Sequence, residues 1–162
     1  MAKVIMIRNT YGGAGYLANA LNYVRDERNQ YGGGYGVDPY SPTVAYEQMM
    51  YTKRYFNKTS GNPLVHIIVG YTKNVTSMNA AAAYGDSIAR MFADRYQVLY
   101  CTHQYDDEYY NWYHTHLIVN SVSYVNGAMM ETGYRDMNQF CKQVSGVLNE
   151  PCTFIFKNKS EM

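Results

Sequence analysis

The segment 114–124 is the part of this chain that most restricts the folds open to it. Its composition is that of a strand, in which successive side chains point to opposite faces. His114, His116 and Ile118 therefore share one face, and Leu117 lies on the other. A strand with apolar side chains on both faces lies in the middle of a sheet. The chain must supply further strands on both sides of this one and helices to cover them.

Apolar periodicity predicts those surrounding elements. The strongest helix pattern lies over 77–96, where small and apolar residues fall on one face and alanine favours helix. Strands are predicted over 3–8, 64–71, 97–103, 114–124 and 153–157, helices over 16–26, 43–57, 77–96 and 137–148, and a long glycine-rich loop over 30–42. This order predicts a single α+β domain over 1–162, with helices packed on a mainly antiparallel central sheet in two or three layers.

Composition limits the ways in which such a domain could bind a partner. The 162 residues are enough for one domain with a substantial core. The net charge is +1, so no global basic field indicates nucleic-acid binding. Tyrosine is the unusual residue, because 19 Tyr outnumber the 14 Lys and Arg together. Aromatic side chains stack on the bases of single strands, so binding of that kind stays open.

Cysteine spacing and hydropathy bear on the compartment. Cys101, Cys141 and Cys152 are widely spaced and form no Cys-x-x-Cys pair, which is typical of reduced thiols in a cytoplasmic protein. The longest apolar run, 64–69, is interrupted by His66 and is far too short to span a membrane. We therefore expect a cytoplasmic protein without membrane insertion.

Three of the four histidines can meet at one end of the predicted sheet. His103 ends the strand before 114–124, and a ten-residue loop separates it from His114. If the two strands form a hairpin, the Cβ atoms of His103 and His114 lie about 5 Å apart, with His116 beside them. Three neutral imidazoles suit a catalytic divalent metal with open coordination positions. Purely structural histidines are the alternative, and the set alone does not choose between Zn and Mn or Mg.

Three further polar residues are candidates to support these ligands. His66 lies in the middle of the strand 64–71 and is either a core histidine or a group that contacts a ligand. Asp106 lies in the loop between the two histidine strands, where a carboxylate could orient an imidazole through its second nitrogen, although a solvated loop tip fits equally. Asn120 continues the histidine face of the strand 114–124.

Several stretches follow one another in an order that resembles a known family. They are Ala20-Leu21-Asn22-Tyr23-Val24 with Arg25-Asp26-Glu27, Thr52-Lys53 to Gly61 with His66-Ile67-Ile68-Val69, the helix 80–93 with the strand 96–99, Thr102-His103 with 114–120, and Tyr134-Arg135-Asp136. Together they resemble the conjugative relaxases, the plasmid-mobilisation nucleases of the His-x-His superfamily. The match covers most of 16–145. Relaxases usually carry a further C-terminal domain, so the chain also fits the N-terminal part of a longer protein.

The resemblance implies a chemistry and a set of partners. Tyr23 would be the nucleophile, and His103, His114 and His116 would hold a divalent metal, Mn or Mg rather than Zn. Helix periodicity alone does not separate Tyr23 from Tyr16. The reaction would nick and rejoin one DNA strand at a plasmid or mobile-element transfer origin through a 5′-phosphotyrosine intermediate. Single-stranded DNA, accessory DNA-binding proteins and coupling proteins would be the partners.

DNA contacts are expected from local basic and aromatic residues. The tyrosine-rich stretch 31–51 could stack on bases, or it could be a flexible loop beside a solvated helix face. The family's second motif usually continues into a DNA-binding Ser, but Gly70 stands here, with Thr72 two residues later. The family's His-x-Asp is His103-Gln104-Tyr105, so the Asp is displaced or replaced by Asp106. The candidate DNA contacts are Arg25, Lys53, Arg54, Lys58, Thr72 and Trp112.

Three other functions compete with this interpretation. A rolling-circle replication initiator of the same superfamily would use a tyrosine after the His-x-His strand, such as Tyr134, although the spacing to Lys142 fits poorly. A catalytically decayed protein that only binds single-stranded DNA would account for Gly70 and Tyr105. A zinc hydrolase would need a Glu base beside the histidine pair, which the sequence lacks.

Overall fold

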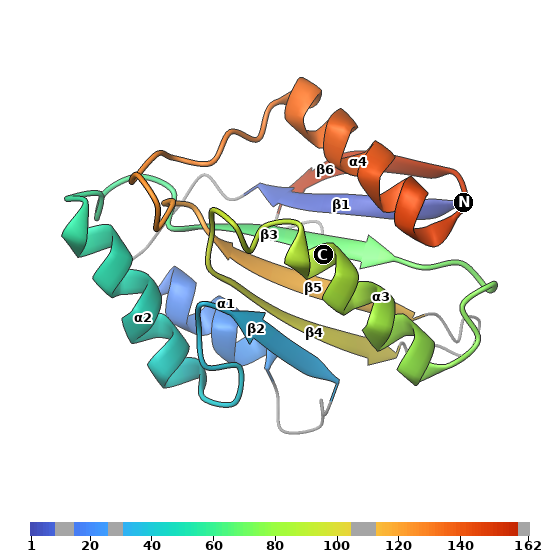
Figure 1. Ribbon diagram of the computed structural model, residues 1–162, viewed down its shortest axis with the longest axis horizontal. Helices are drawn as coiled ribbons and strands as arrows, with labels where there is room; N and C mark the ends of the chain where they lie inside the picture. Colours follow the sequence, from blue (N-terminus) through green and yellow to red (C-terminus); the bar gives the residue numbers. More distant parts are fainter. Residues whose placement is uncertain (9–14, 26–30, 105–112, 159–162) are drawn as a thin grey trace.

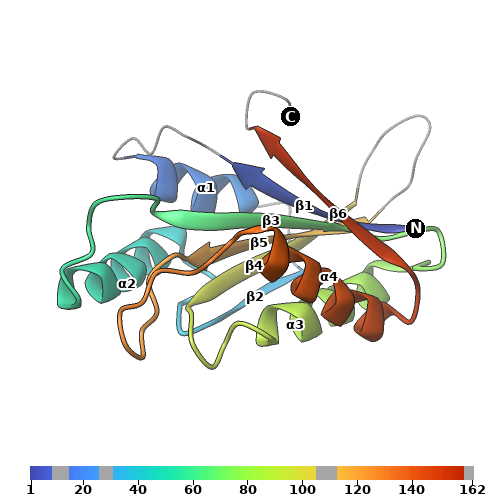
Figure 2. The same ribbon diagram turned by 90° about the horizontal axis from the view of Figure 1, so that it is seen from above.

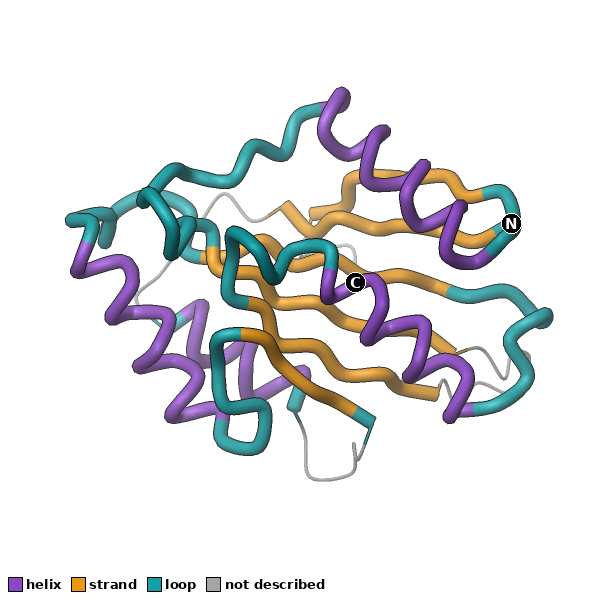
Figure 3. Tube along the Cα trace, in the orientation of Figure 1, coloured by secondary structure: helices purple, strands orange, loops and turns teal. Residues whose placement is uncertain are grey.

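The computed structural model describes residues 1–8, 15–25, 31–104 and 113–158 (Figures 1 and 3). Within these ranges lie six strands and four helices. In chain order they are β1 (Ala2–Arg8), α1 (Tyr16–Val24), β2 (Gly32–Tyr35), α2 (Pro42–Tyr55), β3 (Leu64–Gly70), α3 (Met78–Arg90), β4 (Val98–Gln104), β5 (Tyr113–Asn120), α4 (Tyr134–Leu148) and β6 (Cys152–Asn158).

All six strands form one sheet in the order β2-β4-β5-β3-β1-β6. Neighbouring strands are antiparallel except β1 and β6, which run parallel. β5 lies between β4 and β3, and its residues from His114 to Asn120 are buried. The structure thus confirms an α+β fold with a mainly antiparallel sheet and this strand in its interior.

Helices cover both faces of the sheet. Figure 2 shows α3 and α4 on one side and α1 on the other. The first side holds the larger core, in which Ile67, Leu117 and Val119 pack under Ile88 and Phe140. The second side holds a smaller core, in which α1 and α2 pack together on β3, β4 and β5; its members include Leu21, Met49, Leu64, Leu99 and Ile118. The odd and even residues of β5 face different cores, so its histidines lie on the side of the smaller core and their odd-numbered neighbours on the side of the larger core.

Serine side chains fix where two of the helices begin. Ser41 Oγ accepts a hydrogen bond from the Val44 amide at 3.2 Å, and Pro42 follows it in the first turn of α2. Ser77 Oγ accepts from the Ala80 amide at 3.1 Å at the start of α3. Both are the N-cap arrangement that satisfies an otherwise unpaired helical N–H. α3 ends at Arg90, so the predicted helix 77–96 is too long at its C-terminal end.

The expected loop over 30–42 contains a strand. β2 (Gly32–Tyr35) pairs with β4 at the edge of the sheet. A Cβ at Gly32 would lie 2.8 Å from the Tyr100 carbonyl oxygen, and one at Gly33 would lie 2.6 Å from the Tyr100 hydroxyl. Three consecutive glycines are read as a loop from sequence, but here they allow the edge strand to approach its neighbour closely.

Two sequence expectations about thiols and membranes can be compared with the fold. Cys101 and Cys141 are buried and Cys152 is half-buried, and all three are free thiols. Among the described helices, none combines the length and the apolar composition needed to cross a membrane.

Candidate active site

The β4–β5 hairpin brings the three predicted metal ligands together. His103 is the register partner of His114, and His116 lies two residues further along β5 on the same face. One potential ligand atom from each of the three histidines lies within 4.8 Å of the others. His114 and His116 are buried, whereas His103 is partly exposed. The hairpin geometry expected from the spacing is therefore present, with three imidazoles converging on one point.

His66 joins this group from the neighbouring strand. Its Nε2 lies 2.9 Å from His116 Nδ1, a hydrogen bond between two buried rings. Burial lowers the pKa of His116 well below its usual range, and the neighbouring His66, His114 and His103 lower it further. His116 is thus neutral near pH 7, which is the form that binds metals. With Nδ1 occupied by His66, the nitrogen of His116 that remains for a metal is Nε2.

The C-terminal end of α1 is attached to the same group. His103 Nε2 lies 3.0 Å from the backbone carbonyl oxygen of Val24, the last residue of the helix. A carbonyl can only accept, so the His103 Nε2 carries the proton and donates it. Nδ1 is then the nitrogen of His103 that can bind a metal. The position of α1 thus sets the orientation of the His103 ring.

Tyr23 precedes Val24 and stands over the histidines. Its ring centroid is 5.9 Å from that of His116, with the planes nearly perpendicular at 86°. The side chain is 62% exposed, whereas Tyr16 on the same helix is 8% exposed. Helix periodicity did not separate the two tyrosines, but their burial does. Of these two, Tyr23 has the ring that an incoming substrate can reach next to the histidines.

Cys101 was expected from the sequence as a reduced thiol, but not beside the histidines. It is the register partner of His116 and is fully buried on the histidine face, two residues before His103. That spacing of two on a strand was the signal that could have found it. Its sulfur accepts a hydrogen bond from an Arg25 guanidinium nitrogen at 3.8 Å. It does not belong to the group of converging ligand atoms, which consists of histidine nitrogens alone.

The predicted DNA contacts are scattered. Arg25 is half-buried, and its Nε donates to the Pro39 carbonyl oxygen at 2.7 Å. Arg54 is exposed on α2 and forms an ion pair with Glu47 at 3.7 Å. Lys58 donates to the Gly127 carbonyl oxygen at 2.8 Å, and Thr72 accepts from the Asn74 amide. Trp112 and Asp106, together with Tyr105, lie outside the described residues.

Two of the predicted site residues are in the wrong place for their expected roles. Lys53 is 2% exposed, and its amine donates to the Asn120 side-chain oxygen and to Ser121 Oγ. It cannot contact DNA from this position. Asn120 lies four residues beyond His116, or about 13 Å along the strand, and its amide also donates to Gln97 at 2.9 Å. It belongs to this buried polar group under α2 and does not support a metal ligand.

The buried lysine gives the stability of the fold a specific pH dependence. Burial lowers the pKa of Lys53 from its usual 10.5 to about 8. Between these values the unfolded chain holds the proton more tightly, so the free energy of unfolding should rise from pH 8 to pH 10, by at most about 3 kcal/mol. A Lys53→Met variant should lack this rise. Denaturant unfolding of both proteins across that range measures it, and parallel profiles would contradict it.

Tyr134, the nucleophile of the rolling-circle alternative, lies on the opposite face of the sheet from the histidines. It is the first residue of α4 and packs against Phe154 and Phe156 at ring distances of 5.8 and 5.2 Å. These two phenylalanines pack against the larger core, under α3 and α4. The geometry therefore gives this tyrosine no access to the histidine cluster.

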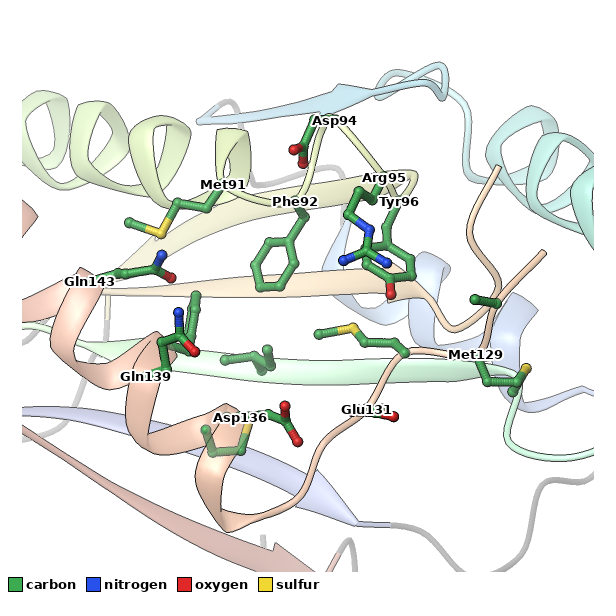
Figure 4. A pocket seen from close by; sticks show the side chains of 15 residues that line it. Met91, Phe92, Asp94, Arg95, Tyr96, Met129, Glu131, Asp136, Gln139 and Gln143 are labelled. Atoms are coloured by element: carbon green, nitrogen blue, oxygen red, sulfur yellow. The ribbon is translucent and has the colours of Figure 1, made fainter. Parts of the chain in front are cut away.

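A cavity of about 430 Å³ also lies on that opposite face. Figure 4 shows it between the end of α3 and the start of α4, with Phe92, Arg95 and Gln139 among the side chains that line it. None of the four histidines contributes to it. This cavity and the histidine cluster thus lie on opposite faces of the sheet.

Comparison with known proteins was consistent with this geometry. A model of the relaxase family, described as MobA/VirD2-like, nuclease domain, matches residues 16–148. Searches of curated proteins and of solved structures gave no match. The matched range contains α1 with Tyr23, all four histidines and α4. Proteins of this family are DNA-nicking endonucleases that act on single-stranded DNA and use a divalent metal. The chain belongs to the MobA/VirD2-like relaxase nuclease family.

Proposed function

We propose that this protein cuts and rejoins one DNA strand at the transfer origin of a plasmid or mobile element, with Tyr23 as the nucleophile. The observation that carries the proposal is the position of the Tyr23 ring, exposed and 5.9 Å from the ring of His116. A nucleophile beside a cluster of potential metal ligands is an arrangement that suits metal-assisted phosphoryl transfer to a side chain.

The covalent step follows from this arrangement. The Tyr23 hydroxyl oxygen attacks the phosphorus, the bond from phosphorus to the 3′ oxygen breaks, and a 5′-phosphotyrosine and a 3′-hydroxyl result. The phenol loses one proton and the 3′ oxygen gains one, so the step is balanced. One phosphate ester replaces another of similar energy, so the 3′-hydroxyl can reverse the attack and reseal the strand without ATP.

His103, His114 and His116 are the residues that would hold a divalent cation. Three imidazoles with ligand atoms within 4.8 Å of one another fit such an ion, with positions left open for substrate. When bound, the ion supplies positive charge that polarises a non-bridging phosphate oxygen. We propose Mn or Mg, as the family resemblance implies, and the two are compared with Zn in the experiment below.

The direct test is the formation of a protein–DNA adduct. The protein is incubated with single-stranded oligonucleotides that cover candidate transfer origins, in the presence of Mn²⁺, Mg²⁺ or Zn²⁺. A band that survives denaturation and carries both the protein and a label at the 3′ end of the oligonucleotide is expected with Mn²⁺ or Mg²⁺, and EDTA should abolish it. Binding of the oligonucleotides without any adduct would instead support the decayed, binding-only alternative.

We further propose that His66 orients His116. For His116 to bind a metal through Nε2, its Nδ1–H must donate to His66 Nε2, which lies 2.9 Å away. The loss of such a partner typically costs 10–100-fold in metal affinity. A His66→Leu variant should therefore bind Mn²⁺ about 10–100-fold more weakly in titration calorimetry, whereas His66→Gln, which keeps an acceptor, should recover part of the loss. An unchanged Mn²⁺ affinity in His66→Leu would leave His66 as a core residue only.

The partners follow from the same proposal. Accessory DNA-binding proteins and coupling proteins would deliver the nicked strand, and the reaction would take place in the cytoplasm. These parts of the proposal rest on the family alone.

A further inference from the structure

The histidine face of the sheet continues past the cluster across β3, β1 and β6. His103 pairs with His114, His114 pairs with Gly70, Gly70 with Lys3, and Lys3 with Thr153. Residues that are directly opposite one another in a sheet point to the same face. Lys3 and Thr153 therefore stand in one row with the two histidines, which runs from the cluster to the β6 edge.

On β1 and β6, this row and the one beside it are open to solvent. Lys3 and Thr153 are exposed, and Ile155 in the next row is 36% exposed. Ile5, the partner of Ile155 on β1, is half-buried. Of the two helices on this face, α1 has its main sheet contacts with β4 and β5, and α2 packs beside α1.

Gly70 makes a gap in the row between His114 and Lys3. Among the described residues, a Cβ built on Gly70 would have one neighbour within 4 Å, the Lys3 carbonyl oxygen at 3.8 Å, so these residues leave room above the backbone for a further group. Strands lie about 4.8 Å apart, which puts the Cα of Lys3 about 10 Å from that of His114. The long, flexible side chain of Lys3 can reach a group that occupies this gap.

The charged side chains on this face of β1 and β6 are lysines. None of the six described strands contains an Asp or a Glu. Lys3 and Lys157 both lie on the histidine face, because Lys157 pairs with Ile7 in β1, four residues along from Lys3. An anionic polymer would find two amines and no carboxylate on this part of the sheet.

We propose that the surface formed by Lys3, Ile5, Gly70, Thr153 and Ile155, called here the β1–β6 strip, carries the DNA strand that adjoins the reacting phosphate. Lys3 neutralises the neighbouring phosphate, the gap at Gly70 admits the sugar–phosphate backbone, and the two isoleucines pack against sugars or bases. The inference rests on the proposed function, because that function places the reacting phosphate at the histidines. Where relatives are expected to have a serine hydroxyl, this chain has Gly70, with Lys3 opposite it on β1.

Salt-dependent binding tests the role of Lys3. The affinity for a fluorescent 20-mer of thymidine is measured by anisotropy over a range of NaCl concentrations, so no origin sequence is needed. Each phosphate contact with a single strand contributes about 0.7 to the slope of log K against log salt. Lys3→Gln should lower that slope by about 0.7, whereas Lys142→Gln, an exposed lysine on α4, should not change it. A slope equal to that of the wild type in Lys3→Gln would overturn the proposal.

Filling the gap tests the role of Gly70. Gly70→Val places a β-branched residue in a strand with no contact shorter than 3.8 Å at its Cβ, so the thermal unfolding midpoint should hold. Binding of the 20-mer should weaken at least about 10-fold, and Gly70→Ala should lie between valine and wild type. Wild-type affinity in a folded Gly70→Val protein would contradict the inference. A wild-type protein that binds through Lys3 and Gly70 but forms no adduct would refute the tyrosine chemistry alone.

Discussion

Replacement of Tyr23 by phenylalanine is expected to abolish the covalent protein–DNA adduct while single-stranded DNA still binds. The substitution removes one oxygen atom, and the exposed ring, 62% accessible, keeps its place above His116. Without the hydroxyl there is no nucleophile, so adduct formation should fall at least about 10³-fold, to the level of the uncatalysed background. Denaturing gels with 3′-labelled oligonucleotides measure the adduct, because the fragment on the 3′ side of the nick stays on the protein, and anisotropy measures binding.

The matched control for this experiment is Tyr134→Phe. Tyr134 is more exposed than Tyr23, at 73%, but it lies on the α4 side of the sheet against Phe154 and Phe156. This variant should form the adduct at the wild-type rate. Loss of the adduct in Tyr134→Phe together with its retention in Tyr23→Phe would reverse the assignment and favour the rolling-circle mechanism.

The central part of the fold could be predicted because its signals are local. Apolar side chains on both faces of β5 indicated a strand in the middle of the sheet, and the ten-residue loop between His103 and His114 suited a hairpin. Both depend on the period of two of a strand and on the shortness of the connection. The register that the structure shows, with His103 opposite His114, follows from those same two features.

The parts that failed depend on contacts between distant segments. By its position, Lys53 looks like a basic residue on the surface of a helix. Its side chain is instead buried beneath α2, because Asn120 and Ser121, about 67 residues later, supply acceptors for its amine. Asn120 was assigned to the histidines because it shares their face of β5, but distance along the strand separates it from them. The contact between His66 and His116 joins β3 to β5 diagonally, and a single strand pattern does not specify it.

Loss of one of the three clustered histidines is the second large effect that we expect. His114→Ala removes a ligand atom from a set that has only three, all within 4.8 Å of one another. The loss in Mn²⁺ affinity should exceed the roughly 10–100-fold that removal of a supporting partner such as His66 would cost. At an Mn²⁺ concentration that saturates the wild type, His114→Ala should then form no adduct.

Thermal unfolding separates loss of the metal from loss of the fold. An ion that binds only the native state at 100 times its dissociation constant stabilises that state by about 2.7 kcal/mol, so the wild-type midpoint should rise when Mn²⁺ is added. His114→Ala should unfold cooperatively with the same midpoint with and without Mn²⁺, and His66→Leu should show a rise only at higher Mn²⁺ concentrations. The stabilisation by Mn²⁺ should thus be lost in His114→Ala and only weakened in His66→Leu. This difference is expected if His114 binds the ion and His66 positions another ligand. Equal responses to Mn²⁺ in wild type and His114→Ala would show that the metal, and with it the proposed catalysis, does not depend on the His103, His114 and His116 cluster.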